Sequence, residues 1–140
     1  DWGIDSDIWS CPSFTELRRD GIDCERWNLL HPEQEPRTPY VRQCLADYQG
    51  PAIASTDYMR SYADQIRPYL DRDYVVLGTD GYGRSDTREN LRRFFEVDRH
   101  YVAVAALKAL ADEGTIKPEQ VGKAIAKYNI DTEAPNPITV

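Results

Sequence analysis

A glycine-rich stretch at residues 78–90 holds the residue types that could bind an anion. It reads Gly-Thr-Asp-Gly-Tyr-Gly-Arg-Ser-Asp-Thr-Arg-Glu-Asn and follows the apolar run Tyr74–Leu77. Glycines let a chain turn sharply and approach a ligand closely, and the N–H groups at a helix start favour negative charge. The residues that would surround the anion are Thr79, Gly81, Gly83, Arg84 and Ser85. The stretch therefore predicts an anion or small-molecule site between a strand and a helix.

The same stretch also fits a plain connection. Its glycine spacing matches neither the phosphate-binding loop nor the dinucleotide-binding pattern. Asp86, followed three residues later by Glu89, predicts a capping box in which each side chain accepts a hydrogen bond from a backbone N–H at the helix start. From the residues alone, both the anion site and the connection remain open.

Few other residues have the spacing that catalysis or metal binding requires. His31 and His100 are the only histidines, and each lacks a second ligand or a nucleophile at a useful spacing. No serine has a Gly-x-Ser-x-Gly setting. Cys11, Cys24 and Cys44 show no Cys-x-x-Cys spacing, which indicates free thiols in a reducing, cytoplasmic compartment. We therefore expect no catalytic, cofactor-binding or metal residues in this chain.

Composition indicates one ordinary globular domain. The 140 residues are 41% hydrophobic and 29% charged, which suits a domain that buries about two-thirds of its unfolded surface. A net charge of −7 argues against a nucleic-acid partner, because binding phosphates requires clustered Lys and Arg. The longest apolar run, residues 101–107, is too short to cross a membrane, so no membrane partner is expected either.

Apolar periodicity predicts an α/β fold whose mostly parallel, mixed sheet is flanked by helices. Strands are predicted at 7–11, 52–55 and 74–77. Helices are predicted on either side of Gly21, over 40–48, from about 57 to 67, around 91–95, over 101–110 and over 118–128, with an irregular tail at 129–140. Helix 101–110 is apolar nearly all round, so Tyr101, Val102 and Val104 are candidate interface residues. Exposed sheet edges also predict self-association.

Three strands are few for a parallel sheet, which is usually larger and covered by helices on both faces. The sequence starts at Asp1 without an initiator methionine or signal-peptide features and reaches a predicted strand almost at once. We therefore expect that either an upstream part was removed or the sequence is one piece of a longer polypeptide. At least one βα unit would lie upstream of Asp1 or be supplied from elsewhere.

Three long stretches resemble the C-terminal domain of the homodimeric type of pyruvate dehydrogenase E1 component. They are Trp9–Pro32, Ala54–Met59 and Val76–Leu91, and the likeness continues at Phe95–Asp98 and Ala124–Asp131. The resemblance covers nearly the whole chain. It implies a transketolase C-terminal-like fold, with residues 1–140 forming a single C-terminal domain fragment of a larger E1 chain.

The resemblance also implies a parent enzyme that uses thiamine diphosphate and Mg²⁺ to decarboxylate pyruvate and to acetylate a lipoyl group. In that family the metal–diphosphate motif, Gly-Asp-Gly with distant asparagines, and the activating glutamate belong to upstream domains. Here Thr79-Asp80-Gly81 replaces the motif, and Asn90 follows too closely to be the distant ligand. Because side chains cannot supply the electron sink for decarboxylation, we expect no cofactor on this segment and no catalysis by it alone.

Two hypotheses follow. In the first, the segment contributes structure and dimer contacts to an E1 enzyme, and its partners are the rest of the E1 chain, a second E1 subunit and the lipoyl domain of the E2 dihydrolipoyl acetyltransferase. In the second, it is an independent small α/β module that binds an anion or nucleotide at the glycine-rich stretch. Saturable binding of phosphate, nucleotides or thiamine diphosphate would distinguish the second from the first.

Overall fold

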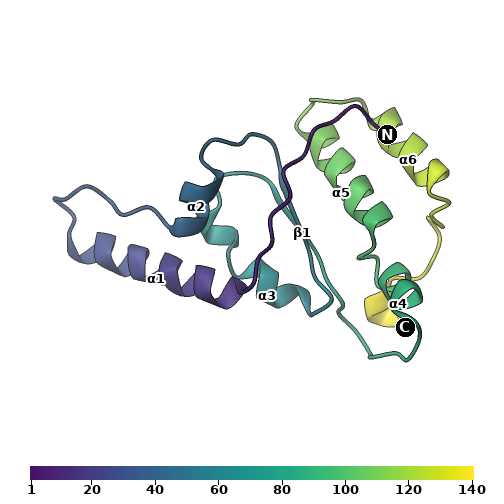
Figure 1. The fold of residues 1–140 in the computed structure, drawn as a ribbon, viewed down its shortest axis with the longest axis horizontal. Coiled ribbons are helices and arrows are strands. Elements are labelled where there is room, and N and C mark those ends of the chain that lie inside the picture. The colour runs from purple at the N-terminus through teal and green to yellow at the C-terminus, as the bar shows by residue number, and fades with distance from the viewer.

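Two short parallel strands with helices on both faces form the centre of the molecule (Figure 1). The computed structural model describes residues 1–140. Its elements are α1 (Phe14–Leu30), α2 (Tyr40–Leu45), β1 (Ala52–Ser55), α3 (Arg60–Asp64), η1 (Arg67–Tyr69), β2 (Tyr74–Leu77), α4 (Arg88–Phe94), α5 (Arg99–Asp112), α6 (Pro118–Lys127) and η2 (Pro137–Thr139). The predicted α/β class and parallel pairing are confirmed, as are the strands at 52–55 and 74–77.

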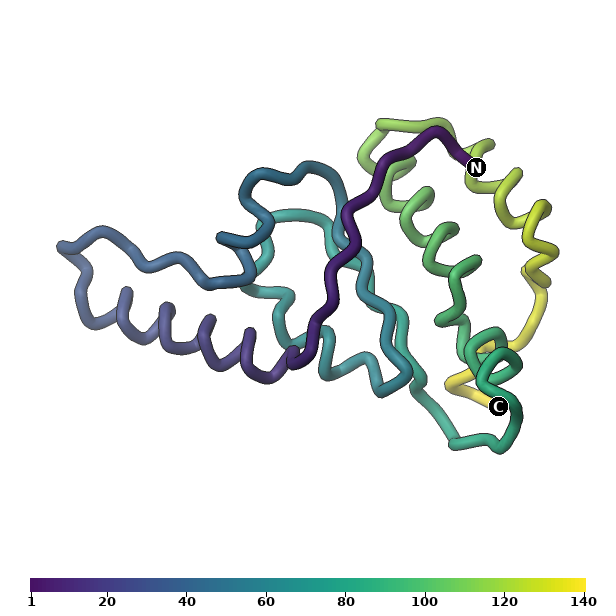
Figure 2. The backbone as a smooth tube through the Cα atoms, in the orientation of Figure 1, coloured from purple at the N-terminus to yellow at the C-terminus, as the bar shows by residue number.

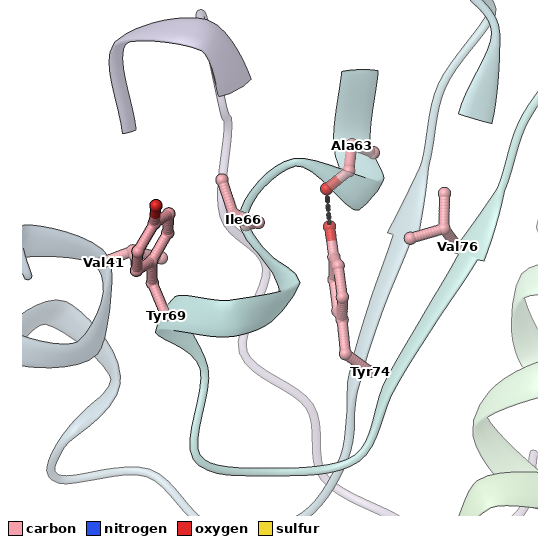
Figure 3. Close-up of a cluster of buried hydrophobic side chains, with 6 residues drawn as sticks. All are labelled: Val41, Ala63, Ile66, Tyr69, Tyr74 and Val76. Atoms are coloured by element: carbon pink, nitrogen blue, oxygen red, sulfur yellow. Dashed lines mark hydrogen bonds between the residues drawn. The ribbon is translucent and has the colours of Figure 1, made fainter. Parts of the chain in front are cut away.

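One face of the sheet packs on α2, α3 and η1. The buried side chains of this first core are Val41, Ala63, Ile66, Tyr69, Tyr74 and Val76 (Figure 3). The Tyr74 hydroxyl donates a 2.9 Å hydrogen bond to the carbonyl of Ala63, which satisfies its polar end inside the core. Burial also raises the pKa of Tyr74, so the phenol stays a neutral donor.

The other half of the molecule is built around the pair of helices α5 and α6. Leu107, Val121 and Ala124 are buried between them, and Trp2 from the start of the chain packs against the same cluster. The indole Nε1 of Trp2 donates to the hydroxyl of Tyr128 at 2.7 Å. The first residues of the chain therefore lie against its last helix (Figure 1).

Helix α1 corrects the prediction of two short helices separated by Gly21. It is one helix of 17 residues, and the Ser13 hydroxyl caps its start by accepting from the Glu16 N–H at 3.2 Å. Gly21 is buried inside it, and a Cβ there would lie 2.5 Å from the Tyr69 ring. The glycine permits close packing of α1 on Tyr69 and does not break the helix.

The strand predicted at residues 7–11 is wrong. The segment forms no bridge to any strand, and the side chain of Ile8 is 94% exposed. Its apolar residues match the pattern of a strand, but a strand also needs a neighbour to pair with, and β1 pairs only with β2.

Arg93 connects three elements of the C-terminal half. Its Nη2 donates to the carbonyls of Tyr128 (3.1 Å) and Asn129 (2.9 Å) at the end of α6, and its Nη1 donates to Asp98 at 3.4 Å. Asp98 in turn caps α5 by accepting from the N–H groups of His100 and Tyr101. Beyond α6, residues 129–140 contain no regular element except η2.

We expect two helix-interior glycines to respond oppositely to alanine. Gly21→Ala should lower the free energy of unfolding by about 1–3 kcal/mol, because the new methyl group would collide with the ring of Tyr69. Gly122→Ala in α6 should raise it by roughly 0.5–1 kcal/mol, because that site is exposed and has no atom within 4 Å of the new Cβ. Urea unfolding measures both, and equal effects at the two sites would contradict the packing role of Gly21.

Arg93 should also be hard to replace. Arg93→Lys is expected to lower the free energy of unfolding by about 1–3 kcal/mol, because an ammonium group cannot reach both carbonyls at the end of α6 and Asp98 together. Arg99→Lys is the matched control, since the Arg99 side chain is exposed and makes no hydrogen bond or ion pair. Thermal unfolding compares the two variants, and a control as unstable as Arg93→Lys would refute the connecting role.

Candidate functional site

The carboxyl ends of β1 and β2 form the edge of the sheet at which α/β proteins usually bind ligands. Two loops leave this edge, residues 56–59 after β1 and residues 78–87 after β2. The second is the glycine-rich stretch. The glycine-rich stretch therefore starts at this edge of the sheet, and the contacts of its residues indicate what they can do.

The first residues of the glycine-rich stretch pack on the loop that follows β1. The Thr79 N–H donates to the Tyr58 carbonyl at 2.9 Å, and the Thr79 hydroxyl donates to the Asp57 carbonyl at 3.0 Å. A Cβ on Gly78 would lie 2.7 Å from the backbone nitrogen of Arg60. Gly78 is thus required for two loops to touch, and the donors of Thr79 are used inside the protein.

Asp80 continues this packing. Its Oδ1 accepts from the backbone N–H of Arg60, the first residue of α3, at 3.2 Å. Met59 at the N-cap position of α3 provides no side-chain hydrogen bond. Asp80 therefore takes part in the capping of a helix that begins 20 residues earlier in the chain.

The later residues of the stretch face different parts of the molecule. Gly81 has φ +106°, and a Cβ there would lie 2.8 Å from the Pro137 carbonyl of the C-terminal tail. The Arg84 guanidinium stacks over the Phe94 ring at 4.2 Å. Gly83 and Ser85 are exposed. Thr79 and Gly81 already contact other parts of the chain, so the geometry favours a plain connection between β2 and α4. The anion site formed by Thr79, Gly81, Gly83, Arg84 and Ser85 stays an untested prediction.

The cap of α4 lies one residue later than predicted. The hydroxyl of Thr87, not the Asp86 carboxylate, accepts from the Asn90 N–H, at 3.3 Å. Asp86 accepts from the Asn90 side chain and the Thr87 N–H at 2.8 and 2.7 Å, and these bonds lower its pKa. The Asp86–Glu89 capping box is therefore wrong, because Asp86 is used in the turn just before the helix.

Arg92 and Asp57 form an ion pair that the sequence does not indicate. Arg92 Nε and Nη2 donate to the two carboxylate oxygens of Asp57 at 2.9 and 2.5 Å. The hydrogen bonds from Arg92 hold the pKa of Asp57 below its usual range. Arg92 thus fixes α4 to the loop after β1. The partners stand 35 residues apart, so no local pattern could reveal them.

The candidate interface helix α5 is half covered by its own chain. Tyr101, Val102 and Val104 are half-buried, because α6 and the sheet pack against this helix. An open groove of about 530 Å³ remains between β2 and α5. Its apolar lining residues are Tyr74, Val75, Leu77, Tyr101, Val104, Ala105 and Ala109. The structure thus brings Tyr101 and Val104 together in one groove, and Val102 lies outside it.

Both histidines have structural contacts. The His31 Nδ1 lies 2.8 Å from the Trp27 carbonyl, and the two rings stack at 4.3 Å. His100 stacks on Tyr128 at 4.6 Å. No cluster of three or more His, Cys, Asp or Glu side chains could hold a metal ion. None of the helices combines the length and apolar character that crossing a membrane requires.

Residues 1–98 match the family model described as the transketolase-like TK C-terminal domain. The chain belongs to this family. Membership confirms the transketolase C-terminal-like fold class that the resemblance implied, and the small parallel sheet with its flanking helices agrees with it.

Several curated proteins are similar to this transketolase C-terminal-like chain. The chain is 63% identical over 140 residues to the pyruvate dehydrogenase E1 component of Cupriavidus necator, which covers 100% of this chain and 16% of the relative. The protein of the same name in Pseudomonas aeruginosa is 61% identical over 139 residues, which covers 99% of this chain and 16% of the relative. The one in Escherichia coli is 59% identical over 138 residues, which covers 98% of this chain and 15% of the relative. The chain thus spans about one-sixth of the length of these relatives.

The Asp57–Arg92 pair predicts a small loss of stability in acid. Because the folded protein lowers the pKa of Asp57, the pair stabilises the fold fully above the unfolded-state pKa of about 4, and this stabilisation is lost as the pH falls through the lower folded value. Asp57→Asn should lower stability at pH 7 and flatten this acid dependence. Glu35→Gln is the control, an exposed acid in the loop after α1 that makes no ion pair. Urea unfolding across pH measures both, and an unchanged acid profile in Asp57→Asn would rule out the pair as its source.

Proposed function

We propose that this chain is the C-terminal part of a pyruvate dehydrogenase E1 component, in which it contributes structure and dimer contacts rather than catalytic groups. The supporting observation is the match of the whole chain, at 63% identity, to a relative with that name. The relatives are about six times as long as this chain, so most of the parent enzyme lies outside residues 1–140.

The parent enzyme would catalyse the oxidative decarboxylation of pyruvate and the reductive acetylation of a lipoyl group. Decarboxylation of a 2-keto acid needs an electron sink, which thiamine diphosphate supplies when it is bound with Mg²⁺. The glycine-rich stretch does not fit the diphosphate of this cofactor, because the Thr79 hydroxyl donates to the Asp57 carbonyl and the Pro137 carbonyl of the tail lies against Gly81. The cofactor sites therefore belong to other domains of the parent.

The partners in this proposal are the rest of the E1 chain, a second E1 subunit and the lipoyl domain of the E2 acetyltransferase. The groove beside α5 supports a contact role, because Tyr101 and Val104 offer half-buried apolar surface there. All three cysteines are free thiols, which agrees with a cytoplasmic enzyme.

The mass of the native chain tests this proposal first. An antibody raised against residues 1–140 should detect a band roughly six times heavier than 16.1 kDa in its native source. The immunoprecipitated protein should also decarboxylate pyruvate when thiamine diphosphate and Mg²⁺ are added. A native band near 16.1 kDa, or a long chain without this activity, would overturn the proposal.

Ligand titration of residues 1–140 provides the complementary control. Under the proposal, phosphate, nucleotides and thiamine diphosphate give no saturable heat in calorimetry. Saturable binding that Arg84→Gln or Ser85→Ala abolishes would instead establish the glycine-rich stretch as an anion site and favour an independent binding module.

A further inference from the structure

A small pocket lies where α1, the loop after it, α2 and η1 meet. After α1 ends at Leu30, residues 31–39 turn back and run beside the helix to α2 (Figure 2). The pocket has a volume of about 270 Å³. Small-molecule sites usually measure roughly 300–1,000 Å³, so this pocket suits a metabolite of few atoms.

The loop that forms one wall of the pocket is held in place by side chains of α1. The Asn28 side chain accepts from the Arg37 N–H at 2.7 Å and donates to the Arg37 carbonyl at 3.0 Å. Asp20 accepts from the Tyr40 N–H at 2.6 Å, which fixes the other end of the loop. A loop positioned by a rigid scaffold is a common place for a binding site. The wall is thus formed before any ligand arrives, which reduces the entropy cost of binding.

Two side chains of opposite charge reach the pocket at the two ends of Tyr69. This tyrosine lines the pocket and is only 6% exposed. Its carbonyl accepts from Arg42 Nε at 3.2 Å, and its hydroxyl donates to Glu25 Oε2 at 3.3 Å. Arg42 comes from α2 and Glu25 from α1, and both line the pocket. Tyr69 therefore spaces a guanidinium and a carboxylate across one small cavity.

Both charged groups keep bonding capacity that the chain does not use. A guanidinium has five N–H donors, and only the Nε of Arg42 has a partner in the protein. A carboxylate can accept several hydrogen bonds, and Glu25 accepts only the one from Tyr69. The two Nη groups of Arg42 and most of the Glu25 carboxylate are therefore available to a ligand.

The third charged residue of the pocket, Arg37, already has partners. Its guanidinium lies over the Trp27 ring, 4.4 Å from the centroid, and 3.8 Å from the Asp23 carboxylate. The charges left for a ligand are thus one positive and one negative.

We infer that this pocket binds a small zwitterion with a carboxylate and an ammonium group, the chemistry of a free α-amino acid. The ligand carboxylate pairs with the planar fork of Arg42, and the ligand ammonium pairs with Glu25. An anion alone would be repelled by Glu25, and a cation alone by Arg42. This inference goes beyond the proposed function, because no step of pyruvate decarboxylation uses the pocket.

Equilibrium dialysis of the full-length native protein against radiolabelled L-alanine and L-glutamate tests the inference. We expect at least one of them to bind saturably, with one molecule per chain. Acetate and methylammonium each carry only one of the two charges, so each should compete at least about tenfold more weakly. Absence of saturable binding by both amino acids would overturn the inference, as would acetate that competes as well as the amino acid.

Alkylation of the cysteines locates the bound amino acid without any substitution. Cys24 lines the pocket, whereas Cys11 and Cys44 lie outside it and serve as internal references. At ten times its dissociation constant, the amino acid should slow the reaction of Cys24 with iodoacetamide by about tenfold. Mass spectrometry of the three peptides measures this. An unchanged rate at Cys24, or equal slowing of all three thiols, would place the ligand elsewhere and refute the site.

Substitution of each charge provides the second check of the site. Arg42→Gln and Glu25→Gln should each weaken amino-acid binding about tenfold or more in the same dialysis. Glu25→Gln keeps an acceptor for the Tyr69 hydroxyl, so it tests the charge even where Arg42→Gln disturbs folding. Arg26→Gln is the matched control, because Arg26 is an exposed residue of α1 outside the pocket. Binding as tight in Glu25→Gln as in Arg26→Gln would contradict the inference.

Discussion

The parallel pairing of β1 with β2 is the constraint on which the rest of the fold depends. Parallel strands need a crossover, so α3 and η1 must pass over one face of the sheet and pack there through Ala63, Ile66 and Tyr69. The pairing also brings the two loops after the strands together. Their contact leaves no room for a side chain at Gly78, so the shape of the candidate site follows from the sheet rather than from a ligand.

The two halves of the molecule are joined by the packing of α5 on the sheet and by polar contacts at the end of β1, and not by one continuous buried core. The Ser55 hydroxyl donates to the Val97 carbonyl at 2.9 Å, and Asp57 binds Arg92. Both bonds leave the end of β1 and reach the segment around α4, while the two buried clusters remain separate. The carboxyl end of β1 thus positions the C-terminal helices, which explains why polar residues there have structural partners in place of free functional groups.

Local patterns in the sequence predict most helices and strands of this fold, but they do not predict contacts between residues that are far apart in the sequence. The strands at 52–55 and 74–77 and the helix at 118–128 follow from periodicity, and the cap at Ser13 follows from its spacing to Glu16. The prediction that Gly21 interrupts the helix is wrong, because the residue that requires a glycine there, Tyr69, lies 48 residues away in the sequence. Residues 7–11 were predicted as a strand because the pattern reports the faces of a strand but not whether a neighbour exists. For the same reason, the sequence does not reveal the hydrogen bond from the Thr79 hydroxyl to the Asp57 carbonyl in the candidate site.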